Sequence, residues 1–312
     1  MALRKLLAYG CIYILWGGSF LAIRELVGGH DPLPPFFAAG FRFSLAGLLL
    51  LIWSLGAQRS RPTARQVLAS AALGLVMFTC EYSALFWAET RVTSGIAAVV
   101  SAMIPVWIFA GELWVLRTQR ASAWAVGGIA LGFAGVVLLA LPGSAGSSSA
   151  LAIVVMVVGA LCWSAGTLAS RRLDIPASQK TNAGVQMLFG GLLLLVLSVM
   201  VGEHHRMPPH PILLSARILG SMAYLVIAAS IISYTAYVWL LTHDSPTRVA
   251  SYAYVNPVIA LIIGAALAGE RLSAVQGLGA VLVLAGVFAT LRVRNQQASA
   301  PLRPSQCESE QA

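Results

Sequence analysis

Ionisable side chains within long apolar runs are the residues of this chain most able to do chemistry. Arg42 lies in the run 34–56 and Glu81 in the run 67–87, about 12 Å and about 9 Å from the run ends at 1.5 Å per residue. A charge at bilayer depth is costly and normally faces a cavity or a partner. The two residues are therefore expected to approach each other or to share a cavity wall. A structural ion pair and a role in substrate or proton coupling both stay open.

Aromatic and small polar side chains form the second group of candidates. A cavity lined by rings accepts flat or amphipathic solutes and cations through stacking and cation–π contacts. Helix packing is the alternative role for any single ring, and Asn256 can offer hydrogen bonds where a helix is interrupted. The predicted cavity residues are Trp16, Ser19, Arg42, Glu81, Tyr82, Trp107, Trp163, Tyr234, Tyr252, Tyr254 and Asn256.

Two prolines lie in similar surroundings in the two halves of the chain. Pro105 and Pro257 are separated by 152 positions, and each falls within an apolar run. A proline inside a membrane helix removes one backbone hydrogen bond and bends the helix. Interrupted helices at corresponding places in two halves indicate a carrier's binding site. The alternative is that proline is simply common in membrane helices.

Ten apolar runs must position these residues. The chain is 58% hydrophobic and 10% charged, whereas globular proteins have about 25% charged residues. A spanning helix needs about 20 mostly apolar residues, and the runs lack the alternation of membrane strands. The predicted spans are 6–26, 34–56, 67–87, 93–116, 123–142, 150–169, 183–202, 217–241, 248–269 and 273–293.

The second five runs look like a copy of the first five. Segment 15–26 recurs at 162–173, so that Trp163 follows Trp16 by 147 positions. Five crossings are an odd number, so the second copy enters the membrane from the opposite side. The sequence therefore predicts an all-α integral membrane protein with ten transmembrane helices as two inverted five-helix repeats. The predicted division is a first repeat at 1–142, a linker at 143–149, a second repeat at 150–293 and a disordered cytoplasmic tail at 294–312.

The basic residues of the chain follow its expected topology. The net charge is +9, and with a cytoplasmic N-terminus fourteen Lys and Arg fall in cytoplasmic segments against four in outer loops. This bias predicts that both termini face the cytoplasm. No basic stripe or aromatic platform for nucleic acid is present, so we expect membrane lipids and a small-molecule substrate as partners, and no nucleic acid.

Several segments resemble those of EamA-domain proteins, which belong to the drug/metabolite transporter superfamily. Segment 94–105 resembles their fourth-helix pattern, 251–258 with the following Gly269-Glu270 resembles their ninth-helix pattern, and 15–20 is similar to their start. The resemblance covers about residues 6–293 and is closest to bacterial inner-membrane members of the YedA type. It implies a ten-helix fold of two inverted repeats and usually export of small metabolites, amino acids or toxic compounds. Thr118 stands where the family often has a first-half glutamate.

Sequence motifs of enzymes and of nucleotide-driven pumps are missing from the chain. No HExxH, Walker A, GxSxG or paired-cysteine metal spacing occurs. We therefore expect no enzyme, no cofactor and no metal site. The sequence predicts a secondary active transporter of the cell inner membrane that uses ion or solute gradients, with protons as the candidate coupling ion. An uncoupled uniporter or exchanger and a membrane-embedded lipid-handling enzyme are the alternatives.

Overall fold

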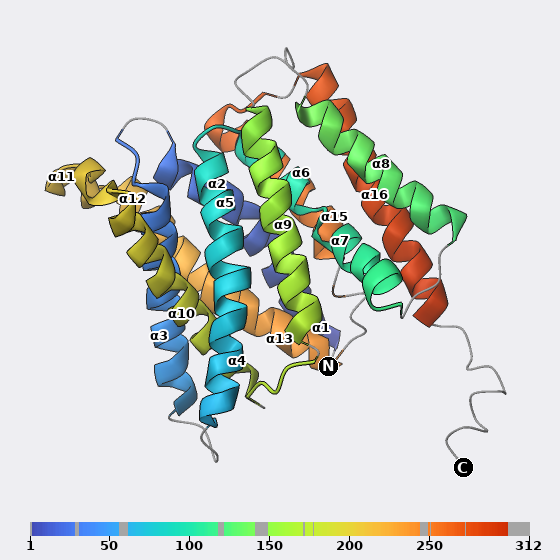
Figure 1. Cartoon of the computed structure of the whole chain (residues 1–312). Coiled ribbons are helices and arrows are strands. Elements are labelled where there is room, and N and C mark those ends of the chain that lie inside the picture. The colour runs from blue at the N-terminus through green and yellow to red at the C-terminus, as the bar shows by residue number, and fades with distance from the viewer. Residues whose placement is uncertain are drawn as a thin grey trace.

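In a computed structural model the chain is described over residues 2–28, 31–55, 62–117, 122–140, 149–170, 172–176, 178–243, 249, 251–271 and 273–298. Every regular element within these ranges is a helix, and the ranges contain no strand. The helices pack side by side into one bundle (Figure 1). The prediction of an all-helical chain is therefore confirmed for the described residues. The predicted linker 143–149 and the tail beyond residue 298 lie outside them, except for Ser149.

The elements of the first half follow the predicted spans closely. Several spans combine α-helix with a wider π-helical stretch, which carries the label η. In chain order the elements are α1 (Ala2–Gly10), η1 (Cys11–Leu15), α2 (Trp16–Val27), α3 (Pro35–Leu55), α4 (Ala64–Gly74), η2 (Leu75–Cys80), α5 (Glu81–Glu89), α6 (Ser94–Ser101), α7 (Ile104–Ala110), η3 (Gly111–Val115) and α8 (Ala123–Ala140).

The second half contains helices at similar places along its length. The elements are α9 (Ala150–Ser170), α10 (Gln179–Met200), the 3-10 turn η4 (Glu203–Arg206), α11 (His210–Leu213), α12 (Ala216–Ala223), η5 (Tyr224–Ile232), α13 (Ser233–His243), α15 (Tyr252–Ala268) and α16 (Ala274–Ala298). Helix α16 continues five residues past the predicted span end, into the segment 294–312 that was predicted as a tail.

Seven helical stretches are long and apolar enough to cross a membrane by length and composition. They are Ala2–Val27, Pro35–Ser54, Ala64–Glu89, Ser94–Val115, Ala150–Ser170, Gln179–Met200 and Ala216–Tyr237. Three further apolar helices, Val126–Leu138, Val255–Ala268 and Ala274–Ala289, are shorter within the described residues. The number of ten crossings therefore stays a prediction.

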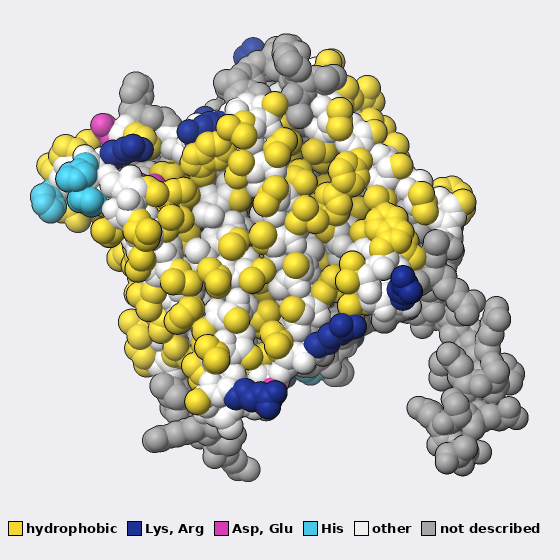
Figure 2. Space-filling view, in the orientation of Figure 1, with side chains coloured by type: hydrophobic (Ala, Val, Ile, Leu, Met, Phe, Trp, Pro, Cys, Tyr) yellow, Lys and Arg dark blue, Asp and Glu magenta, His cyan; other side chains and the backbone are white. Residues whose placement is uncertain are grey.

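The outer surface of the bundle is largely apolar. Leu48 and Ile52 of α3, Val158 of α9 and Val196 of α10 are exposed large hydrophobic side chains. Figure 2 shows hydrophobic side chains covering most of one face, with Lys and Arg near its edges. Exposed apolar surface of this extent is typical of a protein that is surrounded by lipid.

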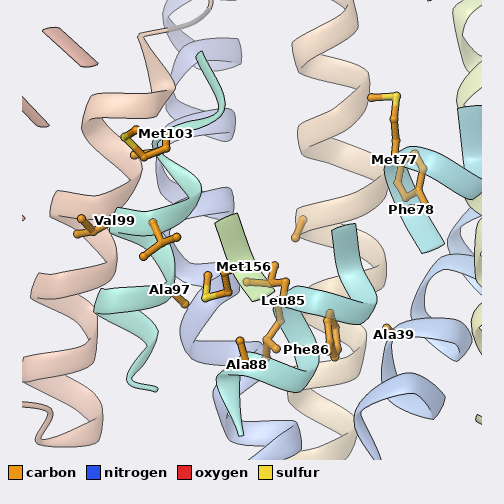
Figure 3. Close-up of a cluster of buried hydrophobic side chains, with 14 of the residues drawn as sticks. Ala39, Met77, Phe78, Leu85, Phe86, Ala88, Ala97, Val99, Met103 and Met156 are labelled. Carbon is orange, nitrogen blue, oxygen red and sulfur yellow. The ribbon is translucent and has the colours of Figure 1, made fainter. Parts of the chain in front are cut away.

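One part of the core lies between α5, α6 and α9. Residues 95–100 of α6 are all buried, because small and apolar side chains occupy every side of this helix. Figure 3 shows part of this core, in which Met156 of α9 lies beside Leu85 of α5. A helix that is apolar all round needs neighbours on all sides, so α6 takes the central position.

Glycines let two pairs of helices approach closely. Helices α8 and α16 cross the edge of the bundle together (Figure 1). A Cβ built on Gly286 would lie 2.6 Å from the carbonyl oxygen of Gly128, so the two backbones touch at this point. Helices α3 and α10 meet in the same way at Gly191, where a Cβ would lie 2.9 Å from the carbonyl oxygen of Gly40.

The two prolines that were predicted to break helices behave differently. Helix α6 ends at Ser101, and α7 begins at Ile104 with Pro105 in its first turn, so the helix is interrupted directly before Pro105. In contrast, α15 continues through Pro257 without interruption. The helix is therefore not divided at Pro257, and the lost hydrogen bond and the bend expected there stay predictions.

Candidate functional site

A central cavity is lined by residues from both halves of the chain. The described lining residues come from α2, α3, η2, α5, α6, α7, α9, α10, η5, α13 and α15. None of them belongs to α8 or α16. Its lining combines many apolar and aromatic side chains with a few polar and charged ones. This composition is typical of a site for a small organic molecule.

Most of the predicted site residues lie on this cavity. Nine of the eleven candidates line it, namely Trp16, Ser19, Arg42, Glu81, Tyr82, Trp163, Tyr234, Tyr252 and Asn256. Pro257 lines it as well, whereas Pro105 is not among the described lining residues. This placement brings together side chains that are up to 240 positions apart, Trp16 and Asn256. Their role in binding stays a prediction.

Trp107 is the candidate that the structure places elsewhere. Its ring packs edge-on against Phe133 of α8, with the ring centroids 4.9 Å apart. Ile104, at the start of the same helix, does line the cavity. Because the helix is interrupted between α6 and α7, the face of α6 does not continue into α7. The expected cavity position of Trp107 is therefore wrong. The backbone of Tyr254 belongs to α15, but its side chain lies outside the described residues.

The aromatic side chains of the wall form two clusters. The Trp16 cluster comprises Trp16, Tyr237 and Tyr252, with centroid distances from Trp16 of 5.4 Å to Tyr237 and 5.1 Å to Tyr252. The Trp163 cluster comprises Trp163, Phe78, Tyr82 and Phe43.

Within the Trp163 cluster, the Trp163 ring lies 5.6 Å from Phe78 and 6.0 Å from Tyr82. The two tryptophans that occupy matching positions in the predicted repeats thus each belong to one cluster. Tilted and edge-on rings at these distances are favourable arrangements, so the rings hold one another in place.

Arg42 and Glu81 are the two charged residues among the described lining residues. Arg42 is buried, its Nε donates to Ser230 Oγ at 3.1 Å, and its guanidinium lies 5.5 Å from the centre of the Tyr82 ring. Glu81 is buried too, and its Oε2 has no hydrogen-bond partner among the described residues. A Cβ on Gly159 would lie 2.6 Å from that oxygen, so the glycine leaves room for the carboxylate. The two residues share the wall, but the structure gives no ion pair between them.

Hydrogen bonds to π-helical segments fix the position of Trp16. Trp16 Nε1 donates to the carbonyl oxygen of Ala229 in η5 at 2.8 Å, and Tyr224 OH of η5 donates to the carbonyl oxygen of Leu15 in η1 at 2.9 Å. A π-helical turn loosens the regular backbone ladder and often occurs at functional sites. These reciprocal bonds join the first span to the span around η5 at the cavity wall.

The sequence reasoning missed several lining residues. They include Phe20, Phe43, Phe78, Ser230 and Tyr237. Tyr237 and the phenylalanines are aromatic like the predicted residues, so the sequence does not distinguish them. Only the orientation of each ring in the structure shows whether it lines the cavity or packs between helices. Ser230 has no signal in the sequence, because its role follows from its contact with Arg42 across 188 positions.

One end of the bundle carries a second polar arrangement, which we call the Glu270 cap. The Glu270 carboxylate accepts hydrogen bonds from Ser94 N at 2.9 Å, Ser94 Oγ at 2.9 Å and Gly95 N at 3.3 Å. It therefore caps the N-terminus of α6, where a negative charge is favourable. Because Glu270 follows α15, the cap ties the two halves of the chain together.

Comparison with known proteins gives one family for the chain. The model of the EamA-like transporter family matches residues 6–141 and 150–292. The chain is 35% identical to the uncharacterized inner membrane transporter YedA of Escherichia coli K12, over 93% of both chains. It is 25% identical to a probable amino-acid metabolite efflux pump of Salmonella typhimurium, covering 89% of this chain and 91% of that protein. A solved crystal structure shares the fold, with a TM-score of 0.62, 18% identity, and coverage of 94% and 98%.

Proposed function

Since the chain belongs to the EamA-like transporter family, as its sequence resemblance predicted, we propose that it is a secondary active transporter that exports small solutes by alternating access. The family and the names of the relatives indicate a membrane transporter of small molecules rather than an enzyme. The direction of transport, the gradient that drives it and the class of solute go beyond the family and belong to our proposal.

The observation that carries the proposal is the central cavity between the halves. Its charged and aromatic lining comes from helices of both family matches, 6–141 and 150–292. A solute bound there contacts both halves, so a rocking of one half against the other would expose the same site to either side of the membrane. The Glu270 cap joins the halves at one end and is suited to hold that end closed.

The proposed architecture is ten crossings in two inverted repeats, 1–142 and 150–293. The two matches to one family model support it. So does the pairing of Trp16 with Trp163 in equivalent ring clusters. In Figure 1, α8 ends and α9 begins at the top of the bundle, whereas α1 begins and α16 ends toward its lower side. Together with the positive-inside bias, this arrangement supports our proposal that both termini face the cytoplasm and that the protein lies in the inner membrane.

Flux measurements in proteoliposomes test the proposal. Purified protein is reconstituted, and counterflow of radiolabelled solutes is measured with and without a pH gradient. We expect saturable counterflow and accumulation above equilibrium when the gradient is present. Saturable flux without accumulation would indicate an uncoupled uniporter or exchanger. Chemical turnover of a lipid without any solute flux would overturn the proposal in favour of an enzyme.

A further inference from the structure

The guanidinium of Arg42 is incompletely satisfied where it lies on the cavity wall. Arg42 is 3% exposed, and its Nη1 is buried without a hydrogen-bond partner among the described residues. Its Nε is held by Ser230 Oγ at 3.1 Å. A buried positive charge with a missing partner is costly unless a counter-charge arrives. Among the described residues, Arg42 therefore leaves a place for a negatively charged group.

No carboxylate among the described residues forms an ion pair with Arg42. Glu81 shares the cavity wall but forms no ion pair with Arg42. Glu89 is close enough to interact electrostatically with Arg42 and Arg24, yet both of its carboxylate oxygens are without a hydrogen-bond partner among the described residues. The remaining neighbours are rings, since the guanidinium lies 4.6 Å from the centre of Phe43 and 5.5 Å from that of Tyr82.

Both aromatic clusters line the same cavity as Arg42. Tyr82 belongs to the Trp163 cluster. Ser230 follows Ala229, whose carbonyl oxygen holds Trp16 of the Trp16 cluster. An anion bound at Arg42 therefore shares the cavity with the rings of both clusters. A planar carboxylate suits this position, because it can accept parallel hydrogen bonds from a guanidinium.

We propose that the cavity binds a small solute that carries a carboxylate and an apolar ring, with the carboxylate held by Arg42 and the ring held between the two aromatic clusters. This inference rests on the proposed function and names the substrate class for its site. Two kinds of solute have this carboxylate and ring in common. One is a simple anion, and the other also carries an ammonium group, which would lie near Glu81.

Binding to the unmodified protein is the first test. Calorimetric titration of purified protein compares phenylacetate, indole-3-acetate and phenylalanine with phenylacetamide and phenylalaninamide, which have the same rings and no carboxylate. We expect the carboxylates to bind about tenfold or more tightly than their amides, because a charge-assisted hydrogen bond is lost in the amides. Tighter binding of phenylalanine than of phenylacetate would identify the solute with an ammonium group as the preferred form.

Variants of Arg42 are the second test. Arg42→Gln should lose the preference for carboxylates over amides, whereas Arg42→Lys should retain part of it because the positive charge remains. Ser230→Ala should weaken carboxylate binding more than amide binding, because it releases the hydrogen bond that holds the Arg42 guanidinium. Arg91→Gln removes an exposed arginine outside the cavity and serves as the matched control.

The outcomes separate this inference from the proposed function. Equal binding of carboxylates and amides by the unmodified protein, or no binding of any carboxylate in the series, would overturn the substrate class. Saturable flux of other solutes would then still support the proposed function as a carrier. Arg42-dependent carboxylate binding without flux in proteoliposomes would support the site and overturn the carrier.

Discussion

At the scale of single residues, the sequence predicted that Arg42 and Glu81 could share a cavity wall, but it did not predict which residues each of them contacts. The sequence places Arg42 and Glu81 at similar depth, and both line the cavity. The bond from Arg42 goes to Ser230, a residue of the other half. Glu81 instead faces Gly159 of α9, where the absence of a side chain makes room for its carboxylate. The two charges therefore have separate surroundings and can have separate roles.

Replacement of Glu81 tests whether it carries a coupled proton. Glu81→Gln keeps the shape of the side chain but is permanently neutral, so it cannot gain and lose a proton as the cavity opens to water. We expect solute exchange to continue, while accumulation driven by a pH gradient falls to the level measured without a gradient. Proteoliposome uptake at a series of pH values measures both quantities.

The matched control for this experiment is Glu25→Gln, which removes a carboxylate that does not line the cavity. Its pH dependence should equal that of the unmodified protein. If Glu81→Gln accumulates solute with an unchanged dependence on the pH gradient, Glu81 does not couple protons.

At the scale of elements, π-helical turns and helix caps determine how the cavity is built. Segment η2 ends directly before Glu81, and η5 contains Ala229 and Ser230. The extra residue of a π-helical turn shifts the helix face that follows it. Hydrophobic periodicity alone does not reveal such a shift. The sequence therefore predicted the spans but not the exact faces that line the site.

Removing the charge of Glu270 should loosen the cap on α6. Glu270→Gln weakens three hydrogen bonds at a helix N-terminus, where a cap contributes about 1 kcal/mol. We expect this end of the cavity to open more often. The measurement is the reaction rate of Ala98→Cys on the cavity wall with a membrane-impermeant maleimide, in a chain without its native cysteines.

Arg271→Gln is the control for the cap, because Arg271 is exposed and adjacent in sequence. Labelling of Ala98→Cys should be faster with Glu270→Gln than with Arg271→Gln. Equal rates in the two variants would show that the cap does not restrict access to the cavity.

The contact between α8 and α16 makes a second prediction at this scale. A Cβ on Gly135 would lie 2.7 Å from the Gly279 oxygen and the Val283 nitrogen, both backbone atoms that cannot move aside. Gly135→Ala should therefore lower the thermal unfolding temperature of the purified protein, with a cost of about 1–3 kcal/mol for overpacking.

Gly127→Ala is the matched control on the same helix, since a Cβ there meets nothing within 4 Å. It should leave the unfolding temperature unchanged or raise it slightly, because alanine favours helix over glycine by about 1 kcal/mol. A similar loss of stability in both variants would contradict tight packing at Gly135.

At the scale of the whole molecule, the proposed topology places the linker and the tail on opposite sides of the membrane. In a chain that retains only Cys307, Ser147→Cys adds a thiol in the linker. Intact cells are treated with a membrane-impermeant maleimide. We expect Ser147→Cys to react from outside, and Cys307 to react only after lysis. Reaction of both thiols from the same side would rule out two repeats of opposite orientation.

The sequence by itself determined the membrane class, the helical fold and the family of this protein. Long apolar runs require helices in lipid, because the bilayer offers no partner for backbone groups. Nine of the eleven side chains that it predicted for a cavity line the cavity of the structure. Only the tertiary structure decided which of them face each other. Arg42 meets Ser230, Trp107 turns to α8, and Glu270 caps α6. The physical reason is that these contacts join segments that are far apart in the sequence. Helix interruptions and π-helical turns also change which side chains a helix presents to its neighbours.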